Sequence, residues 1–96
     1  MKGAIATVDF FASDRPSPPR RLSLVISAPE RCSAGEGWEC RVALADLHRP
    51  EVILGVDSFD ALALAFVQAR TWIAELRGQG RHLTRDREGQ TPFEFP

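Results

Sequence analysis

A change of hydrophobic period at Asp57 divides this chain into two regions that must fold differently. Before Asp57, apolar residues tend to alternate with polar ones, which is the period of a β-strand with one buried face. After Asp57, apolar residues recur every three or four positions, which is the period of one face of an α-helix. The sequence therefore predicts an α+β protein in which strands precede a helix.

The first region contains four predicted strands, over 4–12, 22–27, 38–44 and 51–56. The clearest alternation is in the third strand, and its apolar face is formed by Trp38, Cys40, Val42 and Leu44. In the fourth strand, one side is formed by Val52, Leu54 and Val56.

The connections between these strands are short. A proline-rich stretch, 13–19, ends the first strand, because proline has no N–H to donate to a sheet. A polar loop, 30–37, and a turn, His48-Arg49-Pro50, make the next two connections. Parallel pairing would need crossover helices, so we expect an antiparallel four-stranded meander.

A single long helix is predicted to begin near Asp57 and to end near Gly78 and Gly80. Asp57 or Ser58 can accept hydrogen bonds from the first free N–H groups, and Asp60 adds a negative charge near the positive end of the helix dipole. We expect the helix to pack on one face of the sheet. The predicted sheet-facing stripe is Phe59, Leu62, Phe66, Ala69, Ile73 and Leu76.

With 96 residues, 44% of them hydrophobic, the chain can form one core but not two. We therefore expect a single domain over 1–96, in which 1–20 form the N-terminal strand and proline-rich loop and 21–80 form the core of sheet and helix. In the C-terminal segment, 81–96, Phe93 and Phe95 alternate around Glu94, which indicates a short strand or a loosely packed extended tail.

Three motifs recur together in a known family. They are the strand Trp38-Glu39-Cys40, the stretch from Gly55 to Ala65 that contains G-V-D and A-L-A-L-A, and a closing Pro92-Phe93. In these motifs the chain resembles a family of small bacterial proteins known only as a domain of unknown function. The resemblance covers about residues 20–96 and implies the same fold, but it transfers no functional residue. Where the family often has an aromatic residue, this chain has Leu83-Thr84-Arg85, which implies looser packing of the C-terminal segment.

The composition argues against several classes of partner. Twelve Lys and Arg residues against 13 Asp and Glu leave a formal net charge of −1, so no basic surplus favours nucleic acid or an anionic membrane. The longest unbroken apolar run, Ala61 to Val67, is far below the roughly 18 residues that a membrane span requires. We expect a cytoplasmic protein, in which Cys32 and Cys40 stay reduced.

No catalytic, cofactor-binding or metal site is predicted. Cys40 and His48 have the residue types of a nucleophile and its base, but eight residues of strand separate them by roughly 26 Å. Cys32, Cys40, His48 and His82 have the residue types of zinc ligands, but they lie eight, eight and thirty-four positions apart and lack the close pairs on which zinc sites are built. An enzyme is therefore unsupported by any motif.

Two hypotheses about function remain open. Leu64 and Val67 lie about 160° and 100° around the helix from Phe66, so the sheet cannot cover them. They are a candidate interface for a second copy or for another protein, although cover by the chain itself and simple exposure also explain them. This favours a non-enzymatic bacterial protein-binding or adaptor domain, such as an immunity-type or accessory partner.

The alternative hypothesis is a small-molecule-binding or enzyme-like domain. Its pocket would lie between the sheet and the helix, near Trp38, Cys40 and Trp72.

Overall fold

The strands and the helix follow one another in the predicted order. The computed structural model describes residues 3–14, 17–33 and 35–96, so residues 15 and 16 of the predicted proline-rich loop lie outside the described residues. The elements are β1 (Ala4–Ser13), β2 (Arg20–Ser27), β3 (Glu30–Arg31), β4 (Trp38–Leu44), β5 (His48–Gly55), α1 (Ser58–Gly78) and β6 (His82–Thr84).

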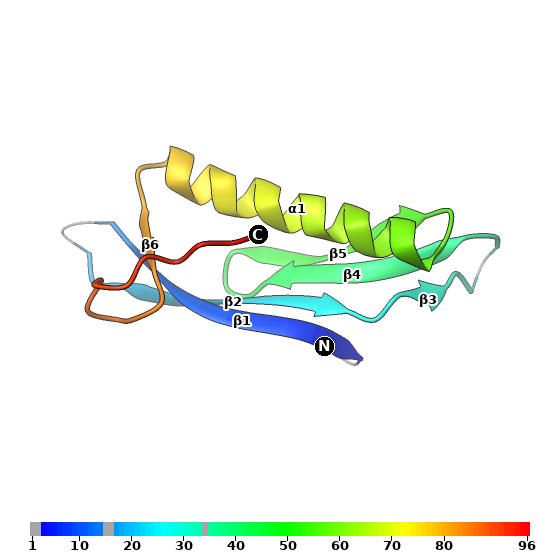
Figure 1. The fold of residues 1–96 in the computed structure, drawn as a ribbon, viewed down its shortest axis with the longest axis horizontal. Helices are drawn as coiled ribbons and strands as arrows, with labels where there is room; N and C mark the ends of the chain where they lie inside the picture. Colours follow the sequence, from blue (N-terminus) through cyan, green and yellow to red (C-terminus); the bar gives the residue numbers. More distant parts are fainter. Residues whose placement is uncertain (1–2, 15–16, 34) are drawn as a thin grey trace.

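All pairings in the sheet are antiparallel, and the strands lie in the order β6-β1-β2-β4-β5. The two-residue strand β3 continues beyond β2 and pairs with the first residues of β4. Helix α1 lies along one face of the sheet, which we call the inner face (Figure 1). The predicted α+β meander covered by one long helix is therefore confirmed.

The start of β5 differs from the prediction. The predicted turn at 48–50 belongs to β5, and the chain turns earlier, where Asp46 has a φ of 71°. Pro50 is tolerated there because the register of β4 and β5 shifts. From His48 to Glu51 the chain advances three residues in β5, whereas the paired residues of β4, Leu44 and Val42, are two residues apart. A bulge in an edge strand accepts a residue without an N–H.

The sheet-facing side of α1 is rotated from the predicted stripe. The buried helix residues are Ala61, Ala65, Ala69, Trp72, Ile73 and Leu76, whereas Phe59 is 85% exposed. The reason is the close approach of the helix to β5, since a Cβ built on Gly55 would lie 2.3 Å from the backbone N of Ala61. Only small side chains fit between the layers at this point, so alanines face the sheet and Phe59 is turned away from it.

Both ends of α1 are formed as predicted. Asp57 is the N-cap, and its carboxylate accepts a hydrogen bond from the backbone N–H of Asp60 at 2.7 Å. The Asp60 carboxylate in turn accepts from the N–H of Val56 at 2.9 Å, so two free donors are satisfied reciprocally. At the other end, Gly80 has a φ of 83°, and its N–H donates to the carbonyl of Arg77.

The C-terminal segment covers the half of the inner face that α1 leaves open. Helix α1 packs against β4 and β5, and the residues after β6 run back between the helix and β1 (Figure 1). Phe93 is 2% exposed and stacks on Phe10 of β1, with ring centroids 4.4 Å apart. Its carbonyl accepts a hydrogen bond from Arg77 of the helix at 2.6 Å. The prediction of a loosely packed tail is therefore wrong at Phe93, while the predicted short C-terminal strand is present as β6.

Asp86 holds the turn that leads to Phe93. Its carboxylate accepts hydrogen bonds from the backbone N–H groups of Gln90 and Thr91, the latter at 2.8 Å. These bonds, that from Thr91 above all, lower the pKa of Asp86 below its ordinary value of 3.8. A carboxyl group with a lowered pKa in the folded protein stabilises the fold above its unfolded pKa, and this contribution is lost as the pH falls through the folded value.

The close contact at Gly55 yields a first prediction. Gly55→Ala should lower the free energy of unfolding by about 3 kcal/mol, because the new methyl group meets backbone atoms that cannot move aside. Gly78→Ala is the matched control. Nothing lies within 4 Å of its added Cβ, and it should raise stability by about 0.4–1 kcal/mol. Urea unfolding measures both variants, and equal stability of Gly55→Ala and the parent would contradict the contact.

The turn at Asp86 yields a second prediction. In an NMR titration, the amide shifts of Gln90 and Thr91 should follow the protonation of Asp86 with a midpoint below 3.8. Asp86→Asn should abolish this transition, because the amide carries no charge that titrates. Amide shifts that do not change with pH in the parent, or a midpoint above 3.8, would show that the carboxylate does not hold the turn.

Candidate functional site

The three residues of the predicted pocket lie on the inner side of the sheet but do not converge. Cys40 is completely buried, and its thiol donates a hydrogen bond to the carbonyl of Ser27 at 3.1 Å. Trp38 is half-buried at one end of β4, where the guanidinium of Arg31 lies 5.1 Å from its ring centroid. Cys40 and Trp38 therefore each have their own separate contacts, to Ser27 and to Arg31.

Trp72 lies near the opposite end of the same pair of strands. Its ring stacks on His48, with centroids 4.6 Å apart, and His48 pairs with Leu44 at the end of β4. Six residues of extended strand separate Leu44 from Trp38, or roughly 20 Å. Trp72 does line a cavity of about 190 Å³ with His48, but that cavity faces Glu75 and Arg81 rather than Trp38.

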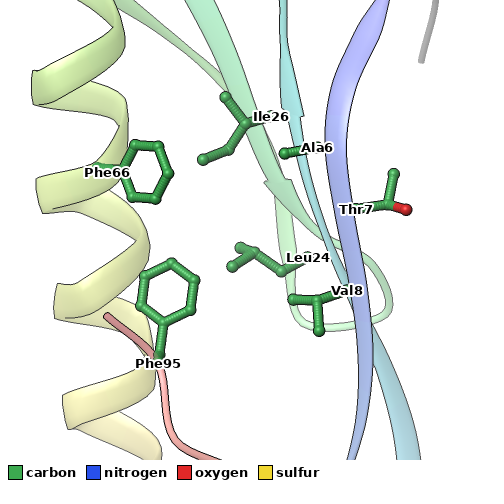
Figure 2. Close-up of a pocket in the computed structure, with 7 residues that line it drawn as sticks. All are labelled: Ala6, Thr7, Val8, Leu24, Ile26, Phe66 and Phe95. Atoms are coloured by element: carbon green, nitrogen blue, oxygen red, sulfur yellow. The ribbon is translucent and has the colours of Figure 1, made fainter.

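An apolar groove between α1 and the β1–β2 half of the sheet was not predicted. Figure 2 shows Phe66 of α1 and Phe95 of the C-terminal segment on one side, facing Leu24 and Ile26 of β2. Residues of β1 complete the lining, which comprises Ala6, Thr7, Val8, Leu24, Ile26, Phe66 and Phe95. The groove exists because the C-terminal segment covers β1 only as far as Phe95.

The size of the groove limits what it can hold. Its volume is about 130 Å³. Pockets for cofactors and drug-sized ligands usually measure about 300–1,000 Å³. A cavity of about 150 Å³ holds a single benzene-sized molecule. The groove therefore fits one apolar side chain or a molecule of a few carbon atoms.

Exposed apolar side chains follow β5 on its side away from the helix. We call them the β5 apolar row, which consists of Val52, Leu54 and, just after the strand, Val56. The sequence grouped these residues on one side of a strand, and the structure shows that Leu54 and Val56 are 64% and 83% exposed. The sequence did contain a signal for this exposure. Gly55 lies between Leu54 and Val56 and has no side chain, which indicates that its side of the strand meets the helix. Leu54 and Val56 therefore face away from the helix.

The two residues predicted as an interface are exposed on the helix. Leu64 is 41% exposed and Val67 is 51% exposed, so both lie outside the sheet-facing side of α1. With Ala65 at the centre of that side, Leu64 lies about 100° away and Val67 about 160° away. The two side chains lie about 60° apart around the helix, with Leu64 toward its side and Val67 away from the sheet, so one partner can contact both.

Two of the three arginines of the C-terminal segment are engaged within the fold. The guanidinium of Arg85 lies 5.4 Å from the ring centroid of Phe93, and that of Arg87 lies 5.1 Å from the ring centroid of Phe11. Cations at these distances from aromatic faces are attracted to them. These residues help to cover the sheet.

The described residues contain neither a cluster of metal ligands nor a helix that could span a membrane. In residues 3–14, 17–33 and 35–96, no three side chains of His, Cys, Asp or Glu gather closely enough to hold a metal ion. Over the same ranges, no helix is both long and apolar enough to cross a membrane.

Comparison with known proteins adds no assignment. No family model, no curated protein and no solved structure matches this chain. The likeness to a bacterial domain of unknown function therefore stays an expectation that rests on its motifs.

The environments of the two thiols yield a third prediction. Burial raises the pKa of Cys40 above its ordinary value of 9.0, whereas Cys32 is partly exposed. Because the thiolate is the reactive form, an alkylating reagent should modify Cys32 first in the native protein. Mass spectrometry at timed intervals measures this order, and the control is the urea-unfolded protein, in which both thiols should react alike. Modification of Cys40 before Cys32 would contradict the buried position of Cys40.

Proposed function

We propose that this protein is a non-enzymatic protein-binding domain of the adaptor or accessory-subunit kind, which contacts its partner through the β5 apolar row. The exposure of Val52, Leu54 and Val56 at alternate positions on one side of the strand is the observation that carries the proposal. Single exposed apolar residues are common on protein surfaces, but contiguous ones mark interaction sites.

The shape of the domain supports this proposal. Its radius of gyration is 14.6 Å, whereas a compact chain of this length has about 12.5 Å. The principal extents of 48 × 23 × 20 Å describe a long, thin body, which offers more surface than a sphere of equal volume. The sheet face opposite α1, which we call the outer face, carries Val52 and Leu54 directly opposite Arg41 and Glu39, and farther along β4 the partly buried pair Val25 and Ala43. A partner could therefore cover a broad surface there.

A small-molecule-binding domain is the second candidate, and the apolar groove beside Phe66 is the observation that favours it. At about 130 Å³, the groove suits a small aromatic or aliphatic molecule rather than a nucleotide or a sugar.

The proposed function yields a fourth prediction. Leu54→Glu should abolish capture of the native partner from an extract of the source cells, because a charge would replace an apolar contact. Val67→Glu is the matched control, since it makes the same kind of change at an exposed apolar residue outside the row, and it should leave capture unchanged. Calorimetry with the purified partner should then show a negative heat-capacity change, the mark of apolar burial.

Two results would contradict the proposal. One is equal capture by the parent and Leu54→Glu. The other is a thermal shift with a small aromatic ligand that Phe66→Ala removes, with no protein captured, which would favour the second candidate.

A further inference from the structure

The free edge of β5 has the features of a pairing site. Strand β5 pairs with β4 along one edge, and among the described residues nothing pairs with its other edge. The strand is eight residues long. Unpaired edges of this length are templates for another strand, and natural sheets usually shorten, charge or cover them. The edge at the other side of this sheet, β6, has three residues.

The structure defines which backbone groups of β5 point outward. The carbonyl of Gly55 points toward β4, because a Cβ built on Gly37 would lie 3.0 Å from it. The N–H of Arg41 points away from β5, since it donates to Ser27 at 2.8 Å. Because these directions alternate along a strand, Gly55, Ile53 and Glu51 bond toward β4. The N–H and C=O groups of Val52 and Leu54 therefore lie on the free edge.

Only one register between two copies of this edge uses all of these groups. When two antiparallel β5 strands meet with Ile53 on the twofold axis, Val52 of each copy pairs with Leu54 of the other and forms four main-chain hydrogen bonds. The same register places the exposed Arg49, within the bulge, and the exposed Asp57 of the other copy, just beyond its strand, at the same end of the ladder, where opposite charges attract.

The neighbouring registers are worse. A shift that places Val52 on the axis brings Leu54 opposite Pro50, which has no N–H to donate. A shift that places Leu54 on the axis brings Glu51 opposite Asp57, where like charges repel. Shifts by one residue would place outward groups opposite inward ones and form no ladder.

The helices also fit this arrangement. Helix α1 packs over β4 and β5, and strands are spaced about 4.8 Å apart. A helix centred over that pair stands about 5 Å from the axis, so two helices would be about 10 Å apart, an ordinary packing distance.

Leu64 lies on the side of α1 that faces the axis. Phe66, on the other side of the helix, stacks on Phe95 above β1 and β2, so Leu64 projects toward the free edge of β5. Because Ala61 lies over Gly55 and the helix runs back along β5 toward His48, Leu64 is also level with Ile53 to within about 2 Å.

We propose that the partner is a second copy of this chain, joined by antiparallel pairing of the two β5 edges with Ile53 on the twofold axis and Leu64 packed against Leu64. The inference rests on the proposed function, because it names the partner of a protein-binding domain. It accounts for the exposure of Val52, Leu54 and Leu64 together, and it leaves Val67 outside the interface.

Light scattering and sedimentation test the association. The parent should run at twice the monomer mass, and Leu64→Glu should raise the dissociation constant of the dimer about a hundredfold by placing two charges at the axis. Val67→Glu, the matched control, should leave the dissociation constant within about twofold of the parent's value. Val52→Pro should raise it about tenfold, because it removes an outward N–H but no bond to β4. Circular dichroism checks that each variant is folded.

Cross-linking tests the register in a Cys32→Ser, Cys40→Ala background, since Cys40 is the cross-strand partner of Ile53 within one chain. Ile53→Cys should form an intermolecular disulfide on mild oxidation, because residues on the axis in this register have Cα atoms about 4.5 Å apart. Val52→Cys and Leu54→Cys should not form one, since each would lie about 8 Å from its symmetry mate, beyond disulfide reach.

Each alternative outcome overturns the inference. A parent that is monomeric at every concentration tested refutes the dimer, and if it still captures another protein and Leu54→Glu abolishes that capture, the proposed function stands without this inference. A dimer that Val67→Glu dissociates, and Leu64→Glu does not, places the interface elsewhere on α1. A disulfide formed by Val52→Cys or Leu54→Cys, and not by Ile53→Cys, refutes the register.

Discussion

The contact between Gly55 and the first turns of α1 decides where every other part of the domain lies. With no side chain at Gly55, the helix approaches β5 until the backbone of Ala61 fills the space of a Cβ. The alanines at 61, 65 and 69 continue this close seam along the helix. The helix is thereby placed over β4 and β5, at one side of the sheet, rather than over its middle.

This off-centre helix explains why the C-terminal segment is an integral part of the core. The inner face of β1 and β2 presents Phe10, Leu22 and Leu24, which α1 alone does not reach. The side chain of Phe93 fills this space by stacking on Phe10, and Arg77 and Arg70 tie the segment to the helix through the carbonyls of Phe93 and Pro96. Cover stops at Phe95, and the groove beside Phe66 is the part of the inner face that remains.

The sequence predicted those features that depend on local periodicity and capping. Alternation located the long strands, and Asp57 was a correct N-cap, because both effects act between residues close in the chain. The predicted helix stripe was right at Ala69, Ile73 and Leu76 but wrong at Phe59, because apolarity alone favours Phe59 over Ala61 and only the spacing between layers reverses that order.

The candidate site was harder to predict for a related reason. Trp38, Cys40 and Trp72 all lie between the sheet and the helix. The point along β4 at which Trp72 lies depends on how the helix is placed over the sheet, and Trp72 lies at the end opposite Trp38. The tight packing of Phe93 likewise depends on the space that the helix leaves over β1 and β2, which no local pattern encodes.

The two edges of the sheet differ in a way that gives β5 its significance. Strand β6 is short and is followed at once by a turn, so its edge offers little to a second strand. Strand β5 is blunted only at its start, where Pro50 and the bulge interrupt regular pairing, and between Val52 and Leu54 its outward groups are free. A proline at one end limits pairing to this stretch without preventing it.

The apolar side chains that flank the free groups would be a liability in a monomer, because they expose both an unpaired ladder and an apolar surface at one place. The same combination is what a strand-to-strand interface requires, since main-chain hydrogen bonds set its register and apolar side chains supply its binding energy.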